Sequence, residues 1–163
     1  MKEADEEIAN GERLLGMSQY DEALKHFNKA TKMDPTNARG FFGKAEASFG
    51  NPKVKPEDIT ELYKRAIELD PENPQYLEAY ASFCMDAGRF KEAEEYYVKA
   101  SELDPDSAPY YLSEFAIQYY ARAPVIMEKF LDEKTKDMIA SKSLEYLLRA
   151  LGIEREEAVR LLK

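Results

Sequence analysis

Small and apolar residues return every three or four positions over most of this chain, which is the spacing of an amphipathic α-helix. Ala23, Phe27 and Ala30 have this spacing and place a small, a large and a small side chain on one helix face. The alanines allow a neighbouring helix to approach closely, and the aromatic ring fills the space between them. The same three slots return at Ile59, Tyr63 and Ala66 and at Ala93, Tyr97 and Ala100.

Each of these three segments ends in Asp-Pro, and the prolines, Pro35, Pro71 and Pro105, are 36 and 34 residues apart. A proline removes an amide donor and biases the residue before it away from the helical conformation, so each segment is predicted to end there. The N-caps predicted for the helices that follow are Thr36 or Asn37, Asn73 with Pro74 at the first helical position, and Ser107.

A second amphipathic stretch lies upstream of each segment and carries a small residue near its middle, at Gly11, Ala45 and Ala81. Short turns around residues 16–18 and 87–88 are predicted to join the two helices of a pair. Because such a hairpin cannot bury its apolar face alone, the hairpins must stack. The sequence therefore predicts an all-α fold, an α-solenoid of stacked helix–turn–helix repeats.

The C-terminal third departs from the pattern. Residues 108–121 resemble the first helix of a fourth repeat, although Phe115 occupies the small-residue slot. After Pro124 the pattern breaks for about one helix, and it resumes at Ser143, Leu147 and Ala150. Residues 108–151 are therefore predicted to form a degenerate or enlarged fourth repeat, and 152–163 a capping helix.

The inserted stretch has apolar residues near one face, and two interpretations compete. The face either packs on the array as core, or it docks into the groove or meets a second subunit. We favour packing, because apolar stripes at helical spacing are usually core. The residues concerned are Met127, Phe130, Leu131 and Met138.

The three in-register copies resemble the tetratricopeptide repeat family over roughly residues 4–107. The resemblance implies a right-handed α-solenoid with C-terminal capping helices, in a single helical-repeat domain over residues 1–163. The repeats implied are residues 1–36, 37–72 and 73–107, followed by the modified fourth repeat and the capping helix.

In that family the first helices of successive repeats line a concave groove that binds peptides. Carried onto this sequence, the contact stripe has the i, i+4, i+7 spacing of one helix face within each helix, with Arg39 beside it. The peptide-binding residues implied are Ile8, Glu12, Leu15, Arg39, Phe42, Glu46, Phe49, Glu78, Ser82, Met85, Leu112 and Tyr119.

Apolar ridges alternate with carboxylates along this stripe, which favours a peptide or helix with apolar anchors and Lys or Arg between them. The resemblance thus implies a protein-binding scaffold or adaptor. The alternative is a self-assembling homo-oligomer whose groove is closed by its own C-terminal helices. The family's carboxylate clamp for chaperone C-terminal tails is not expected, because its basic and amide positions hold Ile8, Glu12, Gly43, Gln75 and Ala79.

Composition narrows the range of partners. The formal net charge is −9, which argues against nucleic acid and anionic membranes as partners. The acidic N-terminus lacks the apolar segment of a signal peptide, and no stretch approaches the ~20 apolar residues of a membrane span. Together with a single cysteine, these features predict a cytoplasmic protein.

Candidate chemistry is sparse. His26 is the only histidine, which excludes a metal site of several histidines. A Ser-His-Asp arrangement is not expected either, because few reactive residues surround His26 in the sequence. Cys84 lies on an apolar helix face and is predicted to be a buried structural thiol. The sequence therefore predicts a protein that is not an enzyme and that uses no metal or cofactor.

Overall fold

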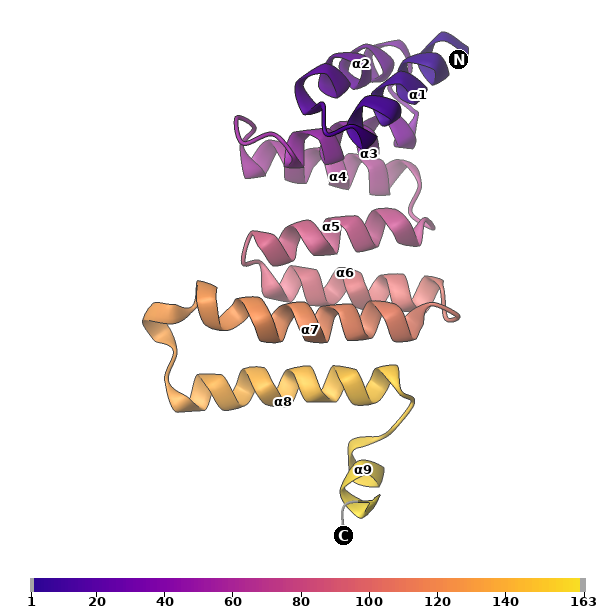
Figure 1. The fold of residues 1–163 in the computed structure, drawn as a ribbon. Coiled ribbons are helices and arrows are strands. Elements are labelled where there is room, and N and C mark those ends of the chain that lie inside the picture. The colour runs from indigo at the N-terminus through magenta and orange to yellow at the C-terminus, as the bar shows by residue number, and fades with distance from the viewer. Residues whose placement is uncertain (1, 162–163) are drawn as a thin grey trace. The chain divides into compact units, whose positions relative to one another are not determined.

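The computed structural model describes residues 2–161, and within that range all regular structure is helical. The predicted all-α class is confirmed. Figure 1 shows the elements in chain order: α1 (Lys2–Gly16), α2 (Tyr20–Met33), α3 (Ala38–Phe49), α4 (Pro56–Leu69), α5 (Pro74–Asp86), α6 (Phe90–Leu103), α7 (Ala108–Ile126), the short 3-10 helix η1 (Glu128–Phe130), α8 (Glu133–Ala150) and α9 (Arg155–Leu161).

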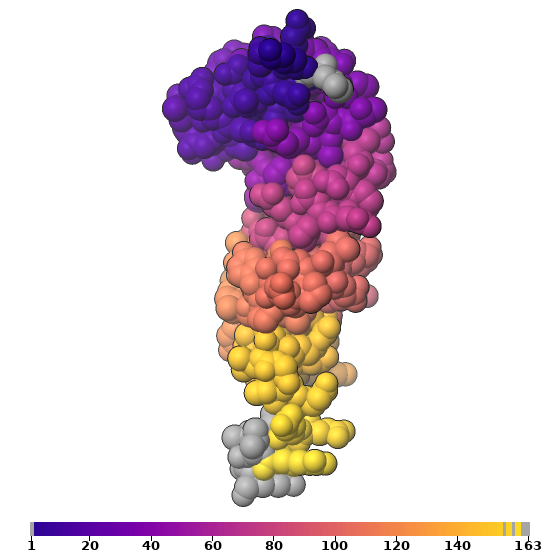
Figure 2. Space-filling model, turned by 90° about the vertical axis from the view of Figure 1, so that its right-hand side faces the viewer, coloured from indigo at the N-terminus to yellow at the C-terminus, as the bar shows by residue number. Residues whose placement is uncertain are grey.

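The chain divides into two compact units, residues 1–76 and 77–163. In the first unit α1 pairs with α2 and α3 pairs with α4, while α3 also packs against both α1 and α2. In the second unit α6 packs against α7, and α7 pairs closely with α8. Figure 2 shows α7 in orange beside the yellow residues of α8. Helices adjacent in the chain are thus neighbours within each unit, as the repeat pattern predicts.

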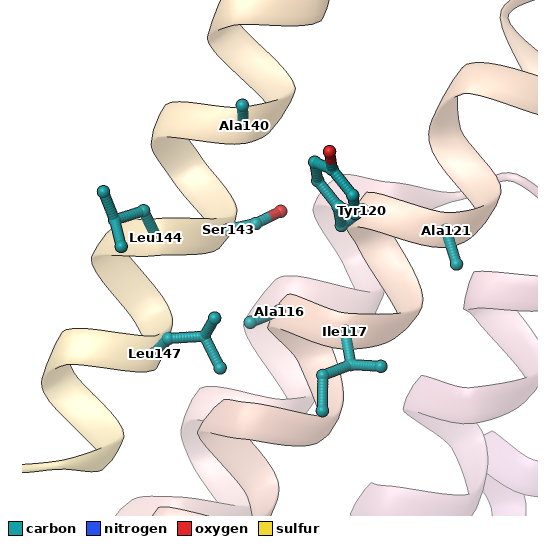
Figure 3. A pocket seen from close by; sticks show the side chains of 8 residues that line it. All are labelled: Ala116, Ile117, Tyr120, Ala121, Ala140, Ser143, Leu144 and Leu147. Carbon is teal, nitrogen blue, oxygen red and sulfur yellow. The ribbon is translucent and has the colours of Figure 1, made fainter.

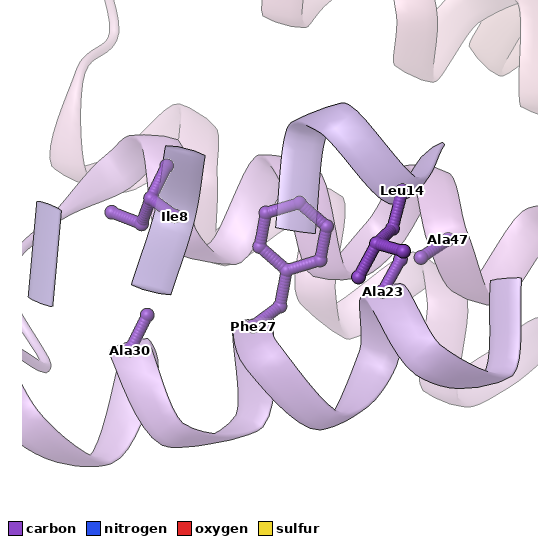
Figure 4. Close-up of a cluster of buried hydrophobic side chains, with 6 residues drawn as sticks. All are labelled: Ile8, Leu14, Ala23, Phe27, Ala30 and Ala47. Carbon is purple, nitrogen blue, oxygen red and sulfur yellow. The ribbon is translucent and has the colours of Figure 1, made fainter. Parts of the chain in front are cut away.

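The core of the first unit is built around Phe27, whose side chain is fully buried. Its ring lies against Gly11 of α1 and Gly43 of α3, where a Cβ would come within 2.8 and 2.2 Å of ring carbons. Three helices can therefore meet around a single ring because two of them carry no side chain at the contact. Figure 4 shows the cluster around it: Ile8, Leu14, Ala23, Phe27, Ala30 and Ala47.

The core of the second unit contains two aromatic residues from different helices. Tyr97 of α6 and Phe115 of α7 are both fully buried, with ring centroids 6.2 Å apart. Phe115 also meets Tyr146 of α8 edge-on, at 4.6 Å. The large residue in the small slot of α7 is thus accommodated by an aromatic partner on α8. The Tyr146 hydroxyl donates to Glu94 of α6 at 2.7 Å, which joins α8 to α6.

The turns after the Asp-Pro dipeptides are held by their aspartates. The Asp34 carboxylate accepts hydrogen bonds from the Thr36 amide and hydroxyl, at 3.1 and 2.7 Å, and these bonds lower the pKa of Asp34. The helices begin where predicted, and Asn37 and Ser107 are the N-cap residues of α3 and α7, although neither side chain forms a capping hydrogen bond. Asn73 does accept a bond from the Gln75 amide, at 3.2 Å.

The C-terminal third differs from the prediction in two respects. No separate helix follows Pro124, because that proline lies inside α7. The segment is instead divided among the end of α7, η1 and the first turns of α8, which begins behind the N-cap Asp132. The favoured packing interpretation is wrong for Phe130 and Met138, whose side chains are 79% and 51% exposed. Residues 162–163 of the predicted capping helix lie outside the described residues.

Within residues 2–161, no helix combines the length and apolarity that crossing a membrane requires.

Candidate functional site

The first candidate surface lies on α1 and α3 of the first unit, and we call it the N-terminal face. Its centre is an ion pair between Glu12 of α1 and Arg39 of α3. The Arg39 Nε and Nη2 donate to the two Glu12 carboxylate oxygens at 2.9 and 2.7 Å, and both side chains are largely exposed. The only cation of the predicted stripe therefore has an acidic partner within the same face.

Phe42 supplies an aromatic surface to this face. Its ring stacks on Tyr76, with centroids 4.5 Å apart, and meets Tyr63 edge-on at 6.3 Å. Tyr76 is buried, whereas Phe42 is half-buried. The Phe42 ring is thus held in place by two others and keeps part of its surface open to solvent.

Glu46 lies one turn further along α3, and it is half-buried. The Tyr63 hydroxyl of α4 donates a short hydrogen bond to its carboxylate. Burial raises the pKa of Glu46, and the bond from Tyr63 partly offsets that rise. Burial on α3 thus disfavours the ionised form of this carboxylate, and the bond from Tyr63 compensates for part of its lost hydration.

The apolar residues assigned to the N-terminal face have unequal access to solvent. Ile8 is completely buried in the core cluster, and Leu15 is half-buried and packs against the same cluster. Phe49, at the end of α3, is 40% exposed. In this structure Ile8 is therefore a core residue, whereas Leu15 and Phe49 keep some surface for contact.

The second candidate surface lies on α5 and α7 of the second unit, and we call it the C-terminal face. Glu78 and Ser82 of α5 are half-buried, and the Glu78 carboxylate accepts a long hydrogen bond, 3.4 Å, from the Tyr110 hydroxyl of α7. Tyr110 is 53% exposed. It was not among the predicted site residues, and its position two residues before Leu112 offered no signal that it would lie beside Glu78.

Three residues assigned to this second surface lie in the interior instead. Met85, Leu112 and Tyr119 are only 1%, 7% and 6% exposed. The Tyr119 ring stacks on Phe115 at 5.4 Å and meets Phe90 of α6 edge-on at 5.3 Å. These side chains stabilise the unit and offer little surface to another chain.

Two family profiles, both described as tetratricopeptide repeat, match residues 8–55 and 55–113. The chain belongs to the tetratricopeptide repeat family. The prediction drawn from the Asp-Pro repeats is thereby confirmed. Proteins with tetratricopeptide repeats generally mediate protein–protein interactions and act as scaffolds.

Curated tetratricopeptide relatives match only in part. The chain is 37% identical over 70 residues to an Hsp70-Hsp90 organizing protein from Triticum aestivum, covering 43% of this chain and 12% of that protein. It is 30% identical over 93 residues to tetratricopeptide repeat protein 13 from Homo sapiens, covering 55% of this chain and 11% of that protein. The match thus spans a small part of each relative.

Solved structures agree on the solenoid fold of tetratricopeptide repeats. The crystal structure of MamA superposes with a TM-score of 0.72 at 15% identity, covering 96% of this chain and 81% of that one. The structure of pilF from Pseudomonas aeruginosa gives 0.66 at 22% identity, covering 91% and 61%. At these identities the likeness concerns the fold alone.

The two side chains with the most reactive chemistry in this tetratricopeptide chain, His26 and Cys84, are held in structural contacts. His26 Nδ1 lies 2.6 Å from a Glu7 carboxylate oxygen, and this hydrogen bond lowers the pKa of Glu7. Cys84 is fully buried, as predicted, and burial raises the pKa of its thiol to about 11. Among the described residues, no group of three or more His, Cys, Asp or Glu side chains is placed to hold a metal ion.

Proposed function

We propose that this chain is a scaffold or adaptor that binds a peptide or helix of a partner protein along the first helices of its repeats. The partner carries apolar anchors with Lys or Arg between them. The observation that carries the proposal is Glu46. Its carboxylate is half-buried, has a raised pKa and accepts a hydrogen bond from Tyr63, on the same face as Phe42.

An ionised carboxylate that is poorly hydrated gains more from a cation than one in bulk water, because the effective dielectric around it is lower. A Lys or Arg of the partner would supply that cation. The partly open Phe42 ring lies one turn away on α3 and would receive an apolar or cationic side chain. Together the two residues favour a ligand in which basic and apolar residues alternate.

Charge distribution supports the same ligand. Residues 1–107 contain 23 acidic and 14 basic residues, so they carry the entire net charge of −9. Both candidate faces are built mainly from this part of the chain. A basic partner would thus be attracted to it, most strongly at low ionic strength.

The carboxylate clamp for chaperone tails plays no part in this proposal. Of the five positions that would form it, Ile8 and Gly43 are buried, and Glu12 is paired with Arg39. Gln75 and Ala79 bring no cation. The partner is therefore proposed to be recognised through internal basic and apolar side chains and not through a terminal carboxylate.

The test begins with selection of binders from a random peptide library displayed on phage, using the full chain. We expect the enriched peptides to combine apolar residues with Lys or Arg. Glu46→Lys and Glu78→Lys should each weaken binding of a selected peptide about tenfold or more. Glu61→Lys, at an exposed position of α4, is the matched control and should bind as the wild type does.

Two results would count against the proposal: enrichment of acidic peptides, or unchanged affinity of both Glu46→Lys and Glu78→Lys. Glu46→Gln separates charge from shape, because an amide oxygen can still accept the bond from Tyr63. It should weaken binding less than Glu46→Lys does, and the salt dependence of affinity should fall.

A further inference from the structure

Among the described residues, the second helix of the fourth repeat, α8, is not covered as its counterparts in the earlier repeats are. Phe27, Tyr63 and Tyr97 occupy the large slot of α2, α4 and α6, and each is at most 1% exposed. In the first unit Gly43 of α3 lies over Phe27. Leu147 occupies the same slot of α8, and it is 36% exposed. A repeat of this kind buries its large slot only when another helix packs beside it.

An apolar hollow of about 400 Å³ lies at this position, between α7 and α8 (Figure 3). Its small side chains leave room, while Ile117, Tyr120 and Leu144 are 56%, 60% and 54% exposed. None of the described lining residues is charged. They are Ala116, Ile117, Tyr120, Ala121, Ala140, Ser143, Leu144 and Leu147.

Ser143 places a buried hydroxyl at this hollow. Its side chain is 4% exposed, and its hydroxyl has no hydrogen-bond partner among the described residues. Figure 3 shows the hydroxyl directed from α8 toward α7. A buried hydroxyl without a partner is unfavourable, so an occupant that brings a polar group to this point would remove the penalty.

The turn between α8 and α9 differs from the turns that lead to a covering helix in the earlier repeats. Gly152 has a φ of +67°, its amide donates to Arg149 at 3.0 Å, and the Ile153 amide donates to Leu148 at 2.9 Å. This is a Schellman motif.

The same motif, centred on Ser18 and Gly88, ends α1 and α5, where it leads back into the second helix of a hairpin. By contrast, the turns that lead to a covering helix contain the Asp-Pro dipeptides, as between α2 and α3 and between α6 and α7. The seven-residue α9 contacts α8, and none of the α9 side chains that the structure describes lines the hollow.

Charge indicates what could lie on this surface. Residues 108–163 contain nine acidic and nine basic residues, whereas residues 1–107 carry the whole net charge of −9. A strongly basic ligand would therefore be attracted elsewhere. Two copies of this chain would repel each other through most of their surface, but they can meet through the neutral α7–α8 surface without net repulsion.

We propose that the hollow is the contact between two copies of this chain, related by a two-fold axis. A two-fold interface must be complementary to itself, because the same residues face each other. This surface offers both of the shapes required, since large exposed side chains such as Ile117 and Leu144 stand beside the small residues Ala116 and Ala140. The large side chains of one copy fill the hollow of the other and cover its Leu147.

The first test is sedimentation equilibrium of the full chain over a range of concentrations. We expect a reversible dimer, and Ile117→Asp and Leu144→Asp should each weaken it at least about tenfold. Val125→Asp is the matched control, because Val125 is 73% exposed on the same helix as Ile117 and lies outside the hollow. A wild type that stays monomeric, or a dimer that both variants leave unchanged, overturns the proposal.

A labelling experiment distinguishes a second copy from the chain's own C-terminal residues as the occupant. Ala140 lines the hollow and Ser141 does not, and both are exposed. The maleimide labelling rate of Ala140→Cys should fall as protein concentration rises, while that of Ser141→Cys should not. Slow labelling of Ala140→Cys at every concentration would show that the chain covers its own hollow, and the proposal would be overturned.

This interface is independent of the peptide-binding proposal. Glu46→Lys and Glu78→Lys should leave the dimer unchanged, and Leu144→Asp should leave peptide affinity unchanged. Failure of one proposal is thus visible without failure of the other.

Discussion

Gly43 lies so close to Phe27 that a Cβ at position 43 would be 2.2 Å from a ring carbon. The ring has little room to move away, because Gly11 also lies against it and the Phe27 side chain is fully buried. We therefore expect Gly43→Ala to destabilise the chain by about 1–3 kcal/mol, the usual cost of overpacking a core. This loss should appear although alanine is favoured over glycine inside a helix by about 1 kcal/mol.

Gly16→Ala is the control for this prediction. Gly16 is the last residue of α1, and a Cβ there meets nothing within 4 Å. Urea unfolding monitored by circular dichroism should show this variant to be as stable as the wild type, or more stable by up to about 1 kcal/mol. Equal effects of the two substitutions would show that helix propensity, and not the contact with Phe27, sets the stability at position 43.

Glu46→Gln should change the pH dependence of stability. Because the pKa of Glu46 is raised above 4.5 in the folded chain, its ionisation costs stability as pH rises through the folded pKa. The neutral amide of the variant would resemble the protonated carboxyl and avoid that cost. We expect Glu46→Gln to have the higher free energy of unfolding at pH 7, and the difference to vanish below the ordinary glutamate pKa of 4.5.

Thermal and urea unfolding between about pH 4 and pH 8 would measure this difference. Glu61→Gln, at an exposed position of α4, is the control and should show little pH-dependent change. If Glu46→Gln proved less stable than the wild type at pH 7, the charge-assisted bond from Tyr63 would outweigh the burial of the carboxylate.

The sequence predicted the helical repeat because its signals are local. Ala23, Phe27 and Ala30 lie within one helix, and an Asp-Pro dipeptide ends a helix by the chemistry of a single peptide bond. By contrast, the repeat pattern breaks after Pro124, yet this proline lies inside α7. The helix continues for two more residues after it, so the local preference of a proline did not decide its end.

The candidate faces were predicted less completely. Helical spacing placed Ile8 and Glu12 on one face, but it could not show that neighbouring helices cover Ile8 and leave Glu12 accessible. The contacts of Glu46 with Tyr63 and of Glu78 with Tyr110 join residues 17 and 32 positions apart. Such contacts depend on how hairpins stack, and periodicity carries no information about that.

The Cys84 thiol should be unreactive in the native chain. Its side chain is fully buried, and its pKa is raised to about 11, so little thiolate is present at pH 8 and reagents cannot reach it. We expect Ellman's reagent to react with the native chain at least about a hundredfold more slowly than with the chain in denaturant. Fast native reaction would mean that α5 opens readily or that the thiol is exposed.

The ion pair between Glu12 and Arg39 should contribute little to folding, despite its two short hydrogen bonds. Both side chains are largely exposed, at 41% and 54%, so water and salt compete with the interaction. A double-mutant cycle with Glu12→Gln and Arg39→Met should give a coupling energy below about 1 kcal/mol at low salt. It should fall further in about 1 M NaCl, where screening is strong.

The same pair should matter more for binding. Arg39→Met leaves Glu12 without its cation, so the N-terminal face becomes more negative beside Phe42. We expect this variant to bind a basic, apolar peptide more tightly than the wild type at low salt, and Glu12→Gln to bind it more weakly. Isothermal titration calorimetry with a selected peptide would measure both changes. Loss of affinity in Arg39→Met would instead mean that the guanidinium itself contacts the partner, through acidic or carbonyl groups.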